Sequence, residues 1–227
     1  MKTRRKAPTS EDESLMWSRG FVHVAGLDEA GRGPWAGPVY AAAVILPCSM
    51  KQRSCLAQVR DSKTLSHRRR VTLDEIIRDT ALAVGVGRAD AGEIDNIGIV
   101  PATKLAMRRA LADLPLTPEA LIIDALALSG TQLPQVYFPY ADSRSMAVAA
   151  ASIVAKVARD LWMINVADVK YPGYGFAQHK GYGTRQHRDA LDKLGVCDLH
   201  RKSFRPVAVR LALPTSICAL SENCKRC

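Results

Sequence analysis

Two neighbouring carboxylates, Asp28 and Glu29, stand between the apolar run 22–27 and a glycine-rich link. Like-charged acids that share a buried site raise each other's pKa unless a cation is present. A hard divalent cation such as Mg²⁺ commonly takes one or two carboxylates together with substrate phosphate. Because a regular strand directs adjacent side chains to opposite faces, we expect Gly31 and Gly33 to let the backbone leave strand geometry and bring both acids to one site. The pattern predicts a metal site, with an exposed acidic turn as the alternative.

Two further aspartates lie where such an acidic site could be completed. Asp124 ends the apolar run 121–123, and the carboxyl ends of strands are where ligands gather in open α/β sheets. Asp142 precedes Ser145, a residue type that begins helices, and a helix N-terminus favours a nearby negative charge. Each aspartate has a structural alternative as a simple cap. Spacing alone leaves both interpretations open.

The segment 178–188 has a composition that suits nucleic acid. It contains Lys180, Arg185, Arg188, Tyr182 and two histidines, and it has no acidic residue. Cations neutralise phosphates while an aromatic ring packs on a base or sugar, and the alternative is a solvated loop that leads into a helix. The whole chain has 32 Lys and Arg against 22 Asp and Glu, a formal charge of +10, which favours a polyanionic partner.

The glycine-rich link does not fit a dinucleotide-binding loop. Such a loop needs a helix that opens directly after the glycines. Here Pro34 and Pro38 intervene, and the next segment, 39–46, has the composition of a strand. We therefore expect no nucleotide cofactor, and we expect a backbone flat enough to touch a large substrate.

The chain is long enough, at 227 residues with 48% hydrophobic content, for one large domain with a full core. Short β-branched runs predict strands, and Ser or Thr ahead of helical segments predicts helix starts. The expected strands are 22–27, 39–46, 81–86, 120–124 and 136–138, and the expected helices are 66–80, 103–111, 145–167 and 184–195. This order indicates an α/β fold with a mixed central sheet flanked by helices, and with a C-terminal helical appendage.

The chain divides into three expected parts: a mobile N-terminal arm over 1–20, a domain over 21–211 and a cysteine-containing tail over 212–227. No apolar run reaches the ~18–20 residues of a membrane span, and no signal peptide is visible, so we expect a soluble, cytoplasmic protein. The tail cysteines are Cys218, Cys224 and Cys227. No histidine follows them to complete a tetrahedral zinc site, so we expect reduced thiols there.

Several short motifs follow one another along the chain. The longest runs from Gly26 to Pro34 and continues through Gly37-Pro38-Val39. The others are Asp61-Ser62-Lys63, Ile123-Asp124, Ala141-Asp142-Ser143, the segment 150–160 and His179-Lys180-Gly181-Tyr182. The chain therefore resembles the ribonuclease HII family from about Val22 to Arg210, with both tails outside the resemblance.

The resemblance implies a ribonuclease H-like fold and an endonuclease that hydrolyses the RNA strand of RNA–DNA hybrids and cuts 5′ to ribonucleotides embedded in duplex DNA. It implies that four carboxylates form the catalytic metal site, namely Asp28, Glu29, Asp124 and Asp142. It implies substrate contacts for Gly31, Arg32, Gly33, Lys63, Lys180 and Tyr182. Among these, the Gly31-Arg32-Gly33 segment would contact the 2′-hydroxyl, and Tyr182 would pack on the sugar at the RNA–DNA junction.

We expect two Mn²⁺ or Mg²⁺ ions about 4 Å apart, one activating the attacking water and the other stabilising the leaving 3′-oxygen. The products are 3′-hydroxyl and 5′-phosphate ends. The expected partners are RNA–DNA hybrid and ribonucleotide-containing DNA, distinguished by the 2′-hydroxyl rather than by base sequence, and the enzyme is expected to be a monomer that binds no membrane. The alternatives are a non-catalytic nucleic-acid-binding protein and a DNA nuclease or transposase of the same general fold.

Three positions depart from the family's pattern. Tyr140 stands where lysine is usual two residues before the fourth aspartate, Ala125 replaces the glycine usual after the third, and Trp35 replaces a smaller apolar residue. None of these changes removes a carboxylate. Asp160 is expected to be structural, with Lys156 one helical turn earlier as its partner.

Overall fold

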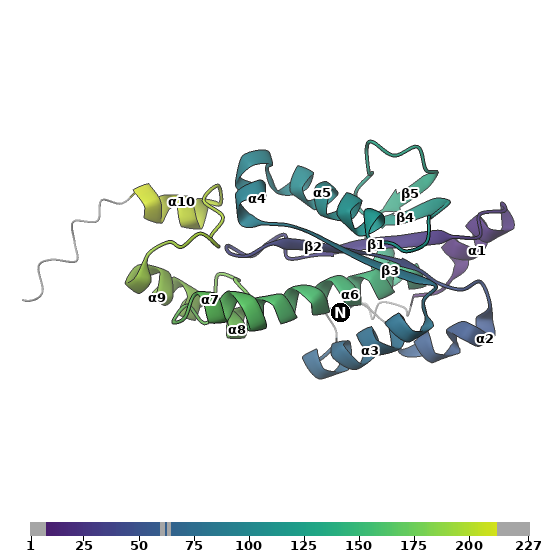
Figure 1. Ribbon diagram of the computed structural model, residues 1–227, viewed down its shortest axis with the longest axis horizontal. Coiled ribbons are helices and arrows are strands. Elements are labelled where there is room, and N and C mark those ends of the chain that lie inside the picture. The colour runs from purple at the N-terminus through teal and green to yellow at the C-terminus, as the bar shows by residue number, and fades with distance from the viewer. Residues whose placement is uncertain (1–7, 60–61, 63–64, 213–227) are drawn as a thin grey trace, which may run out of the picture.

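The computed structural model describes residues 8–59, 62 and 65–212. Its five strands form one mixed sheet in the order β3-β2-β1-β4-β5 (Figure 1). The strands are β1 (Val24–Ala30), β2 (Val39–Ile45), β3 (Ala83–Ala89), β4 (Ala120–Asp124) and β5 (Gln135–Phe138). β1, β2 and β3 are antiparallel neighbours, whereas β4 runs parallel to β1 and β5 runs parallel to β4. This sheet confirms the predicted α/β class.

Helices precede, separate and follow the strands. Up to β4 they are α1 (Glu11–Ser18), α2 (Met50–Arg53), the 3₁₀ turn η1 (Ser54–Gln58), α3 (His67–Thr80), α4 (Ala91–Ile97) and α5 (Ile99–Ala112). After β5 they are the 3₁₀ turn η3 (Ala141–Ser143), α6 (Met146–Trp162), the π-helical η4 (Met163–Ala167), α7 (Asp168–Lys170), α8 (Phe176–His179), α9 (Arg185–Leu194) and α10 (Arg205–Ala212).

The sheet carries a different helix layer on each face. α4 and α5 cover one face, and α3 and α6 cover the other, above and below the strands in Figure 1. Along β1, Leu27 packs into the α5 side and Ala30 into the α6 side. A Cβ on Gly26 would collide with the backbone of Ala147. The missing side chain at Gly26 therefore lets α6 lie directly against the strand that carries Asp28.

Three helices begin at the predicted caps. The side-chain oxygens of Ser66, Ser145 and Thr184 each accept a hydrogen bond from the backbone N–H three residues further on. α9 also ends at the predicted position, before Gly195, whose φ is 77°. These cap predictions are confirmed.

β1 begins and ends later than expected. The predicted strand 22–27 is observed at Val24–Ala30, and the predicted strand 81–86 at Ala83–Ala89. Asp28 and Glu29 therefore lie inside β1, where they pair with residues of β2 as far as Ala30. The expectation that the glycines draw both acids out of strand geometry is wrong, because the ladder with β2 holds both residues in the sheet.

Residues 8–20 differ from the expected mobile arm. In α1, the Glu13 carboxylate accepts hydrogen bonds from the Ser145 hydroxyl at 2.6 Å and from the Ala147 N–H at 2.7 Å. Glu13 is 1% exposed, and Thr9 pairs with Ser145 in an isolated bridge. A carboxylate at a helix N-terminus satisfies free N–H groups and interacts favourably with the helix dipole. The described part of the arm is thus a cap for α6.

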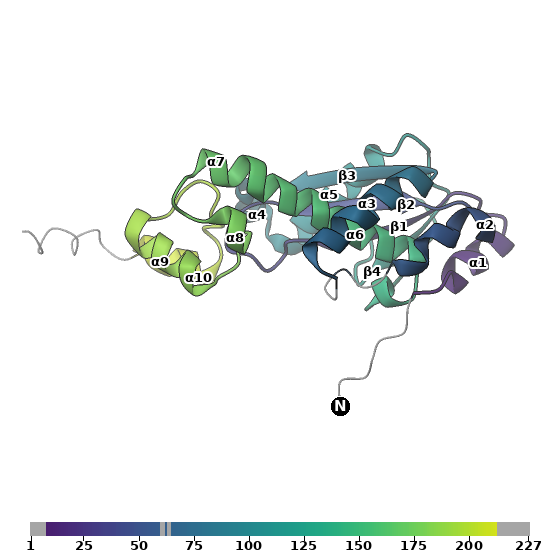
Figure 2. The same cartoon turned by 90° about the horizontal axis from the view of Figure 1, so that it is seen from below.

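Helices α7 to α10 gather at one end of the molecule, away from α1 and α2 (Figure 2). Their core contains Phe176, Tyr174 and Met163. An isolated bridge between Ala36 and His200 joins this lobe to the link after β1. The lobe confirms the predicted C-terminal helical appendage. Among the residues that the structure describes, no helix combines the length and apolarity needed to cross a membrane.

Replacing Glu13 by alanine is expected to destabilise the fold by about 1–3 kcal/mol, because it leaves a buried hydroxyl and a buried N–H without an acceptor. The free energy of unfolding in urea measures this loss. Asp12→Asn is the matched control, since Asp12 pairs with the exposed Arg144, and surface pairs contribute about 0–1 kcal/mol. Equal stability of Glu13→Ala and Asp12→Asn would contradict the capping role.

Candidate active site

Asp28 and Asp124 occupy corresponding positions on neighbouring parallel strands. β1 and β4 are in register up to the pair Leu27 and Ile123, and an aspartate follows in each strand. Leu27 and Ile123 belong to the core on the α5 side, so strand alternation directs both carboxylates to the α6 side. Asp28 is 4% exposed, and Asp124 is half-buried. The register therefore brings these two predicted site residues together.

Burial and neighbouring charges hold the pKa of Asp28 well above its usual range. Burial is the larger cause, followed by the negative charges of Glu29 and Asp124. Hydrogen bonds from Ser152 of α6 and from the Glu29 N–H act in the opposite direction. Three of the four predicted carboxylates are therefore close enough to interact electrostatically.

The other two predicted carboxylates border this pair. Glu29 accepts a hydrogen bond from the Arg32 guanidinium at 3.2 Å. The backbone N–H of Ala141 donates to Asp124 Oδ1 at 2.7 Å. This bond sets η3, whose second residue is the buried Asp142, beside the end of β4. Residues from β1, β4 and η3 thus meet at one end of the sheet.

The donor set fits a hard divalent cation. All four predicted ligands offer carboxylate oxygens, which Mg²⁺ and Mn²⁺ prefer. A cation beside Asp28 would offset both the cost of burying its charge and the repulsion from Glu29 and Asp124, which together raise its pKa. Within the described part of the chain, no three His, Cys, Asp or Glu side chains already stand in metal-binding geometry. The four-carboxylate metal centre therefore stays a prediction.

The link after β1 lies against the segment that carries Tyr182. The backbone N–H of Trp35 donates to the Gly181 carbonyl at 2.8 Å, and a Cβ on Gly181 would collide with the Ala36 carbonyl. Tyr182 is 42% exposed, and its ring centroid lies 5.9 Å from the guanidinium carbon of Arg159. Two predicted substrate-binding segments that are far apart in sequence are therefore joined directly.

Of the two lysines predicted to contact the substrate, the structure describes Lys180. Lys180 adopts a left-handed φ of 51°, and its amino group donates to the carbonyl of Ala177 in α8. Its charge is thus held against its own helix turn. Lys63 lies outside the described residues.

A histidine relay, formed by His187 and His200 with their partners, lies beside the Tyr182 backbone. His187 Nδ1 donates a hydrogen bond to the Tyr182 carbonyl. The Nε2 atoms of His187 and His200 are 3.0 Å apart, and the Cys197 N–H donates to His200 Nδ1. His179 stacks on His187 with ring centroids 4.4 Å apart. Burial, as the largest cause, lowers the pKa of both relay histidines to about 4. Both rings are fully buried, and burial disfavours their protonated form, so they act as structural groups.

Two buried arginines, Arg159 and Arg201, were missed as functional candidates. Both are 0% exposed, and both donate to backbone carbonyls of the link after β1. A signal existed for Arg159, because it falls on the same helical face as Val148, Ser152 and Ala155, which are all buried. Arg201 follows His200 in a short basic segment without helical periodicity, and the sequence offers no comparable signal there.

The departures from the family's pattern have local consequences. Ala125, directly after Asp124, has a φ of 58°, a left-handed conformation in which glycine is unstrained. Tyr140 has a φ of 63° and is 60% exposed. The Trp35 ring packs on His187, with centroids 5.7 Å apart.

The structural reading of Asp160 is confirmed. Its carboxylate accepts a hydrogen bond from Lys156, and Arg70 lies 3.9 Å away. Asp160 is 3% exposed, so this ion-pair group fixes α6 against α3 and does not extend the carboxylate site.

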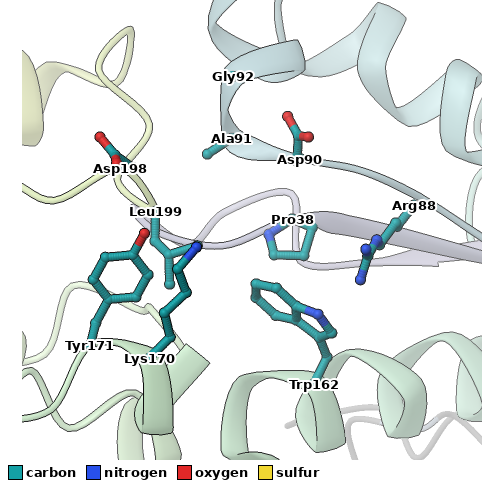
Figure 3. A pocket seen from close by; sticks show the side chains of 10 residues that line it. All are labelled: Pro38, Arg88, Asp90, Ala91, Gly92, Trp162, Lys170, Tyr171, Asp198 and Leu199. Atoms are coloured by element: carbon teal, nitrogen blue, oxygen red, sulfur yellow. The ribbon is translucent and has the colours of Figure 1, made fainter. Parts of the chain in front are cut away.

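A separate cavity of about 350 Å³ lies between the start of α4 and the end of α6 with α7 (Figure 3). It is lined by Pro38, Arg88, Asp90, Ala91, Gly92, Trp162, Lys170, Tyr171, Asp198 and Leu199. Charged side chains of both signs surround it in Figure 3. None of the predicted site residues lines this cavity, so the carboxylate site is a different place.

Comparison with known proteins gives close relatives. The family model described as Ribonuclease HII matches residues 25–207. Ribonuclease HII of Chloroflexus aurantiacus is 53% identical over 201 residues, which cover 88% of this chain and 94% of the relative. The PCNA:RNase HII complex from Archaeoglobus fulgidus aligns with a TM-score of 0.67 and 28% identity over 81% of this chain and 95% of that chain. Bst-RNase HIII in complex with Mn²⁺ has a TM-score of 0.60 and 23% identity over 84% and 70% of the two chains.

The fold and the acidic strand ends define a nuclease of the ribonuclease H-like class. Its mark is a mixed sheet in which β1 lies between antiparallel β2 and parallel β4, with aspartates at corresponding positions of β1 and β4. The chain belongs to the ribonuclease HII family. It is accordingly a metal-dependent endoribonuclease, and the resemblance seen in the sequence is confirmed.

Lowering the pH from 6.5 towards 4 is expected to destabilise the fold through the histidine relay. The pKa of each relay histidine is about 4 when folded against an ordinary value of 6.5. The unfolded chain therefore binds protons first as the pH falls, so this stability is complete above 6.5 and is lost towards 4. Unfolding midpoints between pH 4 and 8 measure the slope.

His187→Gln should flatten this pH slope, because it removes a relay ring. His67→Gln is the matched control, since His67 is exposed at the start of α3. A slope that is the same in all three proteins would show that other groups cause the acid sensitivity.

Ala125→Gly is expected to stabilise the protein by about 0.5–1 kcal/mol, because a left-handed conformation costs an L-residue roughly 1–2 kcal/mol and glycine loses part of this gain through chain entropy. Thermal unfolding measures the change. Ala112→Gly, at the exposed end of α5, should change stability in the opposite direction. A loss of stability in Ala125→Gly would contradict the strain.

Proposed function

We propose that Asp28, Glu29, Asp124 and Asp142 hold the divalent ions and hydrolyse the phosphodiester on the 5′ side of a ribonucleotide. The register of β1 and β4, which sets the first and third of these carboxylates side by side, is the observation that carries the proposal. The substrates are RNA–DNA hybrids and duplex DNA with embedded ribonucleotides. The products are 3′-hydroxyl and 5′-phosphate ends.

The proposed ion is Mn²⁺ or Mg²⁺, because an all-oxygen donor set selects hard cations. Bst-RNase HIII, which shares the fold, is in complex with Mn²⁺. When bound, such ions lower the pKa of the attacking water and stabilise the leaving oxygen. Their charge also favours the ionised form of Asp28, which burial and its acidic neighbours otherwise disfavour.

The chain's own hydrogen bonds orient these carboxylates. The Ala141 N–H fixes one oxygen of Asp124, and the Arg32 guanidinium fixes one oxygen of Glu29. Asp124 and Glu29 thus each have a hydrogen-bond partner from this chain, a backbone N–H for Asp124 and a side chain three residues further on for Glu29, before a substrate phosphate approaches. Such preorganisation reduces the reorganisation that the reaction requires.

Recognition of the substrate is proposed for the other predicted residues. The Gly31-Arg32-Gly33 segment contacts the 2′-hydroxyl, which distinguishes RNA from DNA. The exposed ring of Tyr182 packs on the sugar at the RNA–DNA junction. Lys63 and Lys180 contribute phosphate contacts that position the duplex without reading its bases.

We propose that one chain suffices for cleavage and that it acts in the cytoplasm. All four proposed catalytic residues belong to this chain, so the proposed cleavage needs no residue from a second copy. The relative from Archaeoglobus fulgidus forms a complex with PCNA. A protein partner of that kind is therefore compatible with the fold.

Asp124→Asn is expected to reduce cleavage by more than about 100-fold, because it removes a charge from the metal site, while hybrid binding is retained. The asparagine oxygen can still accept the hydrogen bond from the Ala141 N–H, so the local fold is preserved. The assay is cleavage of a DNA duplex with one ribonucleotide, with and without Mg²⁺, and with an all-DNA duplex as a second substrate.

Asp113→Asn is the matched control. Asp113 also accepts a hydrogen bond from a backbone N–H, that of Val86, but lies at the end of α5. It should leave cleavage unchanged. Full activity in Asp124→Asn would disprove the metal assignment. Binding without any cleavage by the wild type would favour the non-catalytic alternative, and cleavage of the all-DNA duplex would favour a DNA nuclease.

A further inference from the structure

The link after β1 is held from beneath by two buried guanidinium groups. Arg159, near the end of α6, donates to the carbonyls of Pro38 at 2.9 Å and Ala36 at 3.2 Å. Arg201, in the C-terminal lobe, donates to three more carbonyls of the same link. These are Gly31 at 2.6 Å, Arg32 at 2.8 Å and Gly37 at 3.0 Å. Two arginines from distant parts of the chain therefore hold five carbonyls of one eight-residue segment.

This arrangement carries an electrostatic cost. Among the described residues, no carboxylate lies within ion-pair distance of either guanidinium, and one Arg159 nitrogen, Nη1, is buried without a hydrogen-bond partner. Burial lowers the pKa of Arg201 to about 9, and the charge of Arg159 is the second cause. Burying charges that have no opposite partner destabilises a fold. Stability alone does not explain the pair.

The direction of the captured carbonyls determines where the amide groups point. In a planar trans peptide, C=O and N–H point in opposite directions. The carbonyls of Gly31 and Arg32 are directed at Arg201, so the N–H groups of the same two peptides, those of Arg32 and Gly33, are directed away from it. No described residue accepts a hydrogen bond from either N–H. Two adjacent donors are thus turned outward.

The Arg159 side chain packs against the backbone of Gly31 in this segment. Gly31 has a φ of 94°, and a Cβ there would collide with the Arg159 side chain. The guanidinium therefore packs directly beneath the Gly31 backbone, and a side chain at this position would lift the segment away. The positive φ and the close approach both require glycine.

We propose that Arg159 and Arg201 are positioning residues that aim the N–H groups of Arg32 and Gly33 at the 2′-oxygen of the ribonucleotide, so that discrimination between ribose and deoxyribose depends on these two buried side chains. This inference rests on the proposed function of the Gly31-Arg32-Gly33 segment. It adds that the selectivity of this segment is set from α6 and from the C-terminal lobe, not by the segment alone.

Arg201→Lys and Arg159→Lys test the proposal. Lysine keeps the charge but loses the planar fork that reaches several carbonyls at once, so the peptide planes are free to rotate. Small misplacements at a reacting group cost up to about 100-fold. We expect kcat on a duplex with one ribonucleotide to fall about 10–100-fold, with KM and the Kd for an all-DNA duplex unchanged.

A substrate with a 2′-fluoro nucleotide at the same position distinguishes a positioning role from a general loss of activity, because fluorine is a poor hydrogen-bond acceptor for the two N–H groups. The rate ratio between the 2′-hydroxyl and 2′-fluoro substrates should narrow in both lysine variants. A loss that is equal on both substrates, or activity equal to the wild type in a folded variant, would overturn the proposal.

Arg53→Lys is the matched control for removing a buried guanidinium. Arg53 is 6% exposed and donates to the carbonyls of Cys48 and Ser49, next to α2. It should lower Tm without changing kcat or the substrate ratio. If the lysine variants do not fold, Gly31→Ala decides, because its Cβ displaces the Arg159 guanidinium from beneath the same peptide. An unchanged substrate ratio in folded Gly31→Ala overturns the proposal.

The activity of the wild type distinguishes a failure of the proposed function from a failure of the positioning role. If it does not cut the ribonucleotide duplex with Mg²⁺ present, the proposed function fails. If it cuts and folded lysine variants cut equally well, only the positioning role fails.

Discussion

Repulsion between carboxylates that the sheet forces together is the constraint on which the rest of the site depends. Asp28 and Asp124 sit at matching positions of two parallel strands, and neither strand can shift by one residue without turning its core side chains to the wrong face. The hydrophobic cores on both faces of the sheet therefore fix the distance between the acids. Burial is the largest cause of the raised pKa of Asp28, and the negative charges of Glu29 and Asp124 add to it. A divalent cation at the proposed site would offset that repulsion.

The sheet alone does not complete the site, because the substrate-facing residues are held by segments far away in sequence. Glu13 of α1 caps α6 just after Asp142, and Arg201 of the C-terminal lobe holds the link after β1. One end of the described chain thus holds the start of α6, and the other end holds the link after β1. Arg201 lies within residues 25–207 that the family model matches, whereas α1 lies outside them.

Elements with local signals were predictable from the sequence, and elements set by long-range contacts were not. The helix starts at Ser66, Ser145 and Thr184 were predictable because each hydroxyl accepts a hydrogen bond from an N–H only three residues further on. The limits of β1 depend on pairing with β2, so its extension through Asp28 and Glu29 was not visible. α4 was missed although Asp90 and Glu93 form a capping box, because its seven residues are too short for clear periodicity.

The functional residues show the same difference between local signals and long-range contacts. Spacing alone left Asp124 and Asp142 open between a metal site and a simple cap, and the ordered motifs that resemble ribonuclease HII selected the four carboxylates together. Arg159 could have been noticed from its place on the buried face of α6, whereas Arg201 has no comparable signal in a chain with 32 basic residues. Burial changes the electrostatic effect of these two arginines. Salt screens a guanidinium in water, but it screens a buried guanidinium beneath the link much less. Two weakly screened positive charges therefore lie directly behind the segment that follows the buried Asp28 and the half-buried Glu29. If divalent ions are held by these carboxylates as proposed, they would neutralise the repulsion that a phosphate backbone meets beside the link, so cleavage would depend on the metal.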